Sequence, residues 1–150
     1  MSITPEERRN RHHFMAVEAN NRAWGLSTAV RTPADDREMV DAAHAAAWHW
    51  SKVGTELNAV RADALLAEVY ALIGEGARAW TYVERVDAYF AANPGEPWEL
   101  AFLWLTKARA AKAMGKMADY AQFRAEAVAR IDALEADDRE IVMESFRTLE

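Results

Sequence analysis

Cysteine is absent from this sequence of 150 residues. Its absence excludes disulfide scaffolds, thiolate zinc sites and cysteine nucleophiles, and it agrees with a reducing compartment. Proline and glycine are scarce, with four and six residues, so few positions interrupt regular structure. No apolar run approaches the roughly 18 residues of a membrane helix, and the opening MSITPEERRN lacks the apolar core of a signal peptide. We therefore expect a cytoplasmic protein that does not bind membranes.

Positive charge and enzyme motifs are also lacking. The net charge is −6 and the arginines are scattered, whereas nucleic-acid binders concentrate positive charge, so no nucleic-acid partner is expected. The sequence has no phosphate-binding loop, no G-x-S-x-G and no H-E-x-x-H. Gly74-Glu75-Gly76 is too short for a dinucleotide fingerprint and follows a helical pattern. We expect no enzyme activity, no catalytic residues, no cofactor and no metal.

What the sequence does contain is a helical pattern throughout. Hydrophobic residues make up 51% of the chain, enough for a single domain spanning residues 1–150. Thr4-Pro5 and Thr32-Pro33 are helix start signals, and Gly74 is placed to end a helix. No stretch alternates apolar and polar residues as a strand would. The pattern predicts an all-α fold of about seven helices, at 5–28, 34–53, 56–73, 76–92, 97–114, 117–135 and 138–149.

A degraded repeat motif appears in the middle of the chain. Leu66-Ala67-x-x-Tyr70 is followed by Gly74, by alanine and valine at spacing four, and by a closing proline, which is the pattern of a tetratricopeptide (TPR) helix pair. Adding the TPR period of 34 leads to Leu100, Ala101 and Trp104, which repeats the residue classes. The glycines disagree, because Gly74 and Gly115 are 41 positions apart, so the fifth helix carries about two extra turns or the second unit has drifted.

The stretch from His44 to Gly74 resembles a group of small uncharacterised bacterial proteins with TPR-like helices, and so do the later motifs Ala108-x-x-Ala111-x-x-x-Gly115 and Asp137-Asp138-Arg139-Glu140. The resemblance is carried by His44-Ala-Ala-Ala-Trp-His-Trp50, by Arg61-Ala62 and by the run from Leu66 to Gly74. It covers most of the chain and implies TPR-like antiparallel helix pairs in a right-handed superhelical stack. It implies no activity, because no chemistry is assigned to that group.

The histidines and tryptophans are the most conspicuous side chains. His44 and His49 lie five positions apart and point about 140° apart on a helix, so they cannot share one metal ion without a kink. His12 and His13 are adjacent, point to different faces, and are expected to be solvated. The six tryptophans are unusual in number, and most are expected to serve core and inter-repeat packing. The alternative is that one or two of them line a concave surface with Tyr82 or Tyr89, since amphipathic rings are frequent anchors in binding surfaces.

The residues together favour a non-catalytic TPR-like module for protein–protein interaction with an unidentified protein or peptide partner. From repeat position we expect the partner-binding residues to be Trp48, His49, Arg61, Tyr70 and Trp104. Two alternatives remain open: a homo-oligomeric structural protein, such as a homodimer, or a helical domain that binds a small ligand in a pocket lined by histidine and tryptophan. The basic start of the chain and its acidic end would permit head-to-tail contact between copies.

Overall fold

The structure is a computed structural model and describes residues 2–149. These residues form an all-α fold without a strand, which confirms the all-α part of the prediction. The helices are α1 (Pro5–Ser27), α2 (Pro33–Val53), α3 (Glu56–Leu72), α4 (Gly76–Ala92), α5 (Pro97–Ala113), α6 (Met117–Asp132) and α7 (Ala136–Phe146).

The first three helices begin at threonine caps. Thr4, Thr32 and Thr55 each accept a hydrogen bond from the backbone N–H three residues later, and the side chain of that residue bonds back to the threonine N–H. Such reciprocal capping satisfies backbone groups that a helix start would otherwise leave unpaired. Proline follows two of these caps, where its missing N–H costs nothing.

Two glycines end α3 and α5 in the same way. Gly74 and Gly115 have φ of +84° and +72°, a left-handed conformation that only glycine adopts easily. At the first, Gly74 donates to the Ala71 carbonyl and Glu75 donates to the Tyr70 carbonyl, which is the Schellman arrangement. The same pair of bonds recurs around Gly115. Both helices therefore stop sharply and turn back into the next helix.

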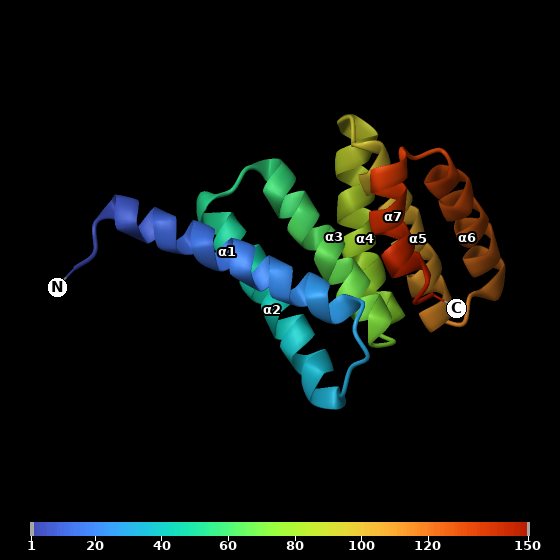
Figure 1. Cartoon of the computed structure of the whole chain (residues 1–150), viewed down its shortest axis with the longest axis horizontal. Coiled ribbons are helices and arrows are strands. Elements are labelled where there is room, and N and C mark those ends of the chain that lie inside the picture. Colours follow the sequence, from blue (N-terminus) through green and yellow to red (C-terminus); the bar gives the residue numbers. More distant parts are fainter. Residues whose placement is uncertain (1, 150) are drawn as a thin grey trace.

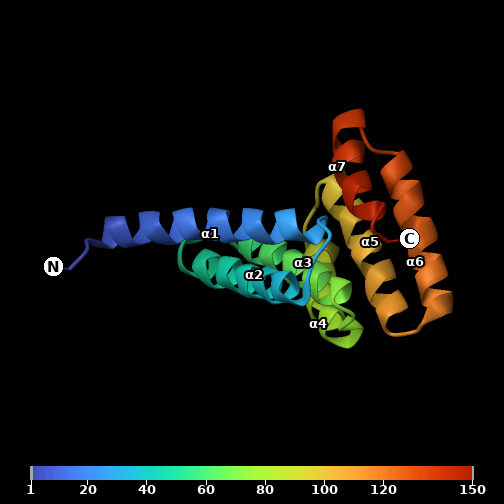
Figure 2. The same ribbon diagram turned by 60° about the horizontal axis from the view of Figure 1, so that its bottom comes forward.

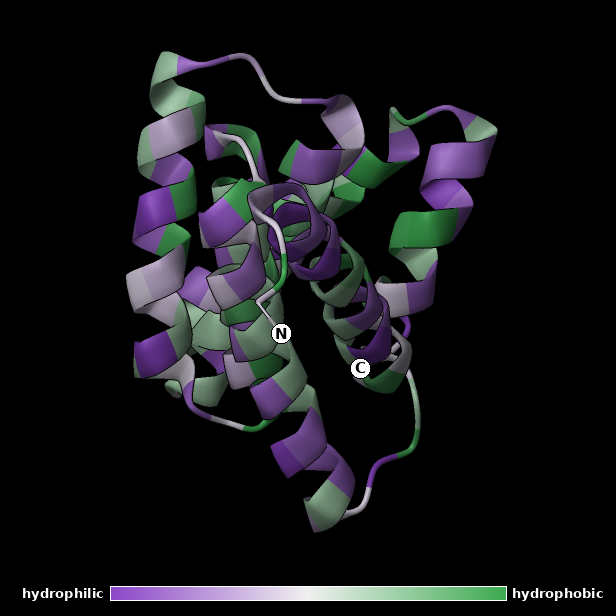
Figure 3. Ribbon diagram, turned by 90° about the vertical axis from the view of Figure 1, so that its left-hand side faces the viewer, coloured by the Kyte–Doolittle hydropathy of each residue, from purple (hydrophilic) through white to green (hydrophobic). Residues whose placement is uncertain are grey.

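Consecutive helices pack against one another along the chain. The α1–α2, α3–α4 and α5–α6 pairs follow in series, and α7 lies against α5 and α6 (Figure 1). The N-terminal half of α1 extends beyond the other helices (Figure 2). Hydrophilic and hydrophobic residues alternate along the helices (Figure 3), as expected of amphipathic helices that each bury one face.

Small residues allow the first helices to approach closely. Ala16, Ala23, Ala43 and Ala46 are completely buried on α1 and α2, and short side chains permit short interaxial distances. One apolar cluster joins α1 to α4 around Leu65, and a second joins α5, α6 and α7. A third cluster joins α3, α4 and α5 between them, so the core extends along the whole helix series.

The structure corrects details of the predicted repeat. The helices α3 and α5 are both 17 residues long, so α5 has no extra turns. Their first residues, Glu56 and Pro97, are 41 positions apart, which is the spacing of the two glycines. The offset of 34 therefore compares residues about two turns apart, on roughly the same face of the two helices. The last helices also end earlier than predicted, at Asp132 and Phe146.

None of the helices in the described part of the chain combines the length and apolar composition needed to cross a lipid bilayer.

Candidate functional site

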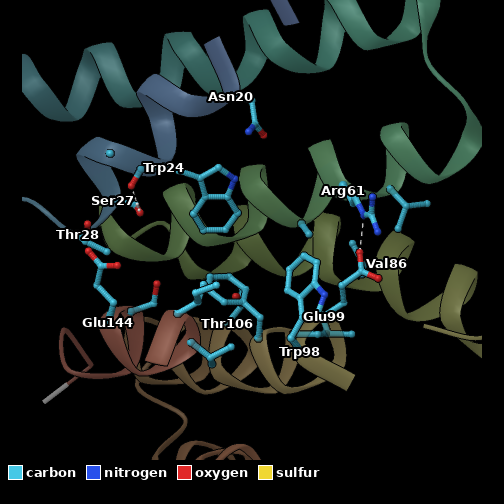
Figure 4. A pocket seen from close by; sticks show the side chains of 18 of the residues that line it. Asn20, Trp24, Ser27, Thr28, Arg61, Val86, Trp98, Glu99, Thr106 and Glu144 are labelled. Carbon is cyan, nitrogen blue, oxygen red and sulfur yellow. Dashed lines mark hydrogen bonds and ion pairs between the residues drawn. The ribbon is translucent and has the colours of Figure 1, made fainter. Parts of the chain in front are cut away.

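A groove of about 550 Å³ lies between α1, α3, α5 and α7. Its side walls come from the C-terminal halves of α1 and α7, and its floor comes from α3 and α5, with two residues of α4 below (Figure 4). This inner groove has the volume and concave shape typical of ligand and peptide sites. The residues that line it include Trp24, Arg61, Trp98, Phe102, Ile141 and Glu144.

The middle of the inner groove is apolar and aromatic. Trp24 of α1 meets Phe102 of α5 edge to face, with ring centroids 5.0 Å apart. Ile141 of α7 is 65% exposed at the rim. Val142, beside it, is completely buried and belongs to the cluster that holds α7 in place. An apolar hollow with aromatic walls and an exposed apolar rim can bury the nonpolar side chains of a partner.

One end of the inner groove carries a charged pair. The Arg61 Nε donates to Glu99 Oε1 at 2.6 Å, and the guanidinium lies 5.9 Å from the centre of the Trp98 ring. Glu99 is buried, whereas the Arg61 side chain is partly exposed to solvent. The hydrogen bond to Glu99 is the main cause that raises the pKa of Arg61 above its usual value. Arg61 therefore presents a fixed positive charge to anything in the groove.

A buried ion pair supports the floor from below. Glu68 of α3 accepts from Arg109 Nε of α5 at 2.5 Å, and it also accepts from the hydroxyl of Thr106, which lines the groove. The Arg109 guanidinium donates further to the carbonyl oxygens of Ser145 and Thr148. This network ties α3, α5 and the end of α7 together beneath the groove.

Of the five predicted binding residues, only Arg61 lines the inner groove. Trp48 and His49 lie on α2, which contributes nothing to the groove lining. Trp48 is 54% exposed, and its ring contacts the ring of His12 at 5.2 Å. The five side chains therefore do not form one surface, because the helices that carry them turn them in different directions.

Tyr70 is part of the core. It is only 5% exposed, its hydroxyl is 2.7 Å from His44 Nε2, and its ring stacks on Tyr82. Trp104 faces α6 and not the groove, since its ring lies 5.8 Å from Phe123 and 4.1 Å from the Lys107 ammonium. Both rings thus have structural partners within the chain.

The histidines gather at the other end of α1. His12 and His49 meet with their Nδ1 atoms 2.8 Å apart, and His13 packs edge to face on Trp50. The expectation of solvated, separate histidines is wrong for His12, whose ring is half-buried against α2. The inner groove contains tryptophan without histidine. Among the described residues, no three potential metal-ligating side chains come together.

The His12–His49 contact predicts a dependence of stability on pH. Burial, and secondly the charge of His12, hold the pKa of His49 below its usual 6.5. Below about pH 6.5 the unfolded chain therefore binds a proton more readily than the folded chain, and the free energy of unfolding should decrease as the pH falls. Urea unfolding at about pH 7.5 and 5.5 measures this decrease.

A matched pair of variants isolates the histidine responsible. His49→Asn should reduce the difference in the free energy of unfolding between the two pH values. His13→Asn leaves the His12–His49 contact intact, so this difference should stay the same. An equal effect of the two substitutions would show that the contact does not cause the pH dependence.

Sequence reasoning missed most of the groove. Its main apolar residues are Trp24, Trp98, Phe102 and Ile141. In the sequence each of them occupies a position in an amphipathic helix that could equally belong to the core. The order of the helices was the available indication of the groove, because in a series of helix pairs the first helix of each pair lines the same face.

Comparisons of the chain with protein-family models, with curated proteins and with solved structures find no match.

Proposed function

We propose that this chain is a non-catalytic TPR-like interaction module that binds an extended or helical peptide segment of a protein partner in the inner groove. In this proposal the three helix pairs form a right-handed superhelical stack and α7 caps its end. The observation that carries the proposal is the origin of the groove, whose walls and floor come mainly from α1, α3, α5 and α7. Stacked helix pairs use such a concave face for binding.

The chemistry of the groove indicates what kind of segment fits. Its aromatic middle suits apolar side chains, and Trp24, Trp98 and Phe102 supply large rings of the kind that dominate binding energy. Arg61 at one end suits an acidic residue, since the Nη donors of its guanidinium are not needed by Glu99. Glu144 at the other end suits a basic residue. The expected partner segment is therefore apolar in the middle and oppositely charged at its two ends.

Selection from a peptide library tests this proposal. The full chain is used to select binders from displayed random peptides, and the affinity of a selected peptide is measured by calorimetry for the natural chain and for two variants. Ile141→Glu places a charge at the groove rim and should raise the Kd of the peptide at least about tenfold. This corresponds to a loss of roughly 1.4 kcal/mol of binding free energy.

The control variant has the same chemistry at a distant site. Met117→Glu also converts an exposed apolar residue, but Met117 begins α6 and does not line the groove. It should leave the affinity within about twofold of the natural chain, a difference below 0.5 kcal/mol. Selected peptides that bind the two variants equally well would show that the groove is not the binding site.

A further inference from the structure

The N-terminal half of α1 carries apolar side chains that nothing in the described chain covers. Phe14 is 62% exposed, and Met15 and Val17 are also exposed. Phe14 and Val17 share a face with Trp24, because residues three and seven apart lie close together around a helix. This α1 stripe, defined by Phe14, Val17 and Trp24, begins where His12 and His13 contact α2 and ends in the wall of the inner groove.

The chain cannot cover the α1 stripe by itself. Phe14 and Trp24 are ten residues apart on one continuous helix, which separates them by about 15 Å. The helix is fixed against α2 by its buried alanines and by the His12–His49 contact. Phe14 therefore cannot reach the groove that Trp24 borders, whereas the Phe14 of another molecule can.

Charge also favours a second copy. Three arginines, Arg8, Arg9 and Arg11, lie beside the start of the α1 stripe, and within the described residues they form no ion pair. The helix α7, at the end of the groove opposite Arg61, exposes Glu144 and also Glu140, which forms an exposed ion pair with Arg147 at 3.4 Å. Opposite charges on two surfaces steer their association and fix its orientation.

We propose that the inner groove binds a second copy of this chain through a two-fold, antiparallel pairing of the two α1 helices. The pairing sets Phe14 of each copy opposite Trp24 of the other, with Val17 near the symmetry axis. It brings the α1 arginines of each copy to the acidic α7 of the other. A two-fold contact of this kind is self-complementary and closes at a dimer.

This inference deepens the proposed function, because it names the chain's own α1 as the segment that occupies the groove. An apolar middle with flanking basic residues is the segment chemistry that Trp24, Ile141 and Glu144 suit. A foreign peptide would then compete with the second copy, and dissociation of the dimer would make the groove available. Self-association thereby regulates partner binding.

The mass of the full chain in solution tests the pairing. Light scattering after size exclusion at low ionic strength should give twice the 16.9 kDa of one chain. Phe14→Glu alters an exposed side chain, so the variant should fold, and it should give the mass of one chain. Met117→Glu is the matched control and should remain a dimer. A natural chain that is monomeric, or a Phe14→Glu variant that stays dimeric, would overturn the inference.

Charge exchange tests the orientation. The double variant Arg9→Glu/Arg11→Glu should dissociate, and so should Glu140→Arg/Glu144→Arg. An equimolar mixture of the two variants restores both contacts in a heterodimer and should dimerise, and so should one chain that carries all four changes. Failure of the fourfold variant to dimerise, with its helical circular dichroism unchanged, would rule out this orientation.

The inference and the proposed function can fail separately. A monomeric chain whose selected peptides lose affinity on Ile141→Glu would remove the dimer and retain the peptide groove. A dimer that Phe14→Glu dissociates, with no peptide sensitive to Ile141→Glu in that monomeric variant, would retain the α1 pairing and remove peptide binding as a function.

Discussion

Replacing Arg109 by methionine is expected to lower the free energy of unfolding by about 3–5 kcal/mol, the usual effect of removing one partner of a buried ion pair. Glu68 is 1% exposed and Arg109 is 6% exposed, so the substitution leaves the Glu68 carboxylate without its counter-charge in a site closed to water. The carbonyl oxygens of Ser145 and Thr148 also lose their donor. Urea unfolding followed by circular dichroism measures the loss.

Two further variants show whether burial causes this effect. Arg22→Met removes a pair with Glu38 in which both side chains are about half exposed, and exposed pairs contribute less than about 1 kcal/mol. Glu68→Leu combined with Arg109→Met leaves no buried charge and should recover part of the loss. Equal losses for Arg109→Met and Arg22→Met would contradict the assignment of a buried, structurally important pair.

Replacing Trp24 by alanine is expected to lower the free energy of unfolding by about 2–4 kcal/mol, somewhat less than for a fully buried tryptophan. Trp24 packs against the cluster that joins α1 to α4 and also against the cluster that joins α5, α6 and α7. Its edge-to-face contact with Phe102 connects the two. Removing the ring opens a cavity at the junction of the two clusters, and thermal and urea unfolding both report the destabilisation.

Trp48→Ala is the matched control for this prediction. Trp48 has the same side chain, but it is 54% exposed on α2 and contacts only neighbouring rings and Lys52. Its removal should cost less than about 1 kcal/mol, as for most surface substitutions. If the two alanine variants unfold at the same urea concentration, the ring of Trp24 does not join the two clusters as described.

The local elements of this fold were predictable because their causes are local. A threonine followed by proline and, three residues on, by an acidic residue contains every group that a helix cap uses. The same holds for Gly74, whose left-handed conformation needs no distant partner. The ends of α6 and α7 were predicted less well, because no glycine or proline follows Asp132 or Phe146 to mark where the helix stops.

The candidate site was not predictable to the same degree. Arg61 lines the groove, whereas Tyr70 and Trp104 were chosen from a repeat period of 34, and the structure spaces α3 and α5 by 41. Two residues that are seven positions apart are separated by about two helical turns less 20°, so they lie on roughly the same face of the helix. The choice therefore depended on which face of α3 and α5 the neighbouring helices cover, and the repeat pattern does not contain that information.

The amino-acid sequence by itself determined that the chain forms helices, where most of them begin and end, and which face of each is apolar, because caps, turns and periodicity act within a few residues. Only the tertiary structure decided which tryptophans line a groove and which are packed away, and that Glu68 meets Arg109. Those outcomes depend on contacts between helices that are distant in the chain, and many residues that look alike in an amphipathic pattern have different neighbours in space.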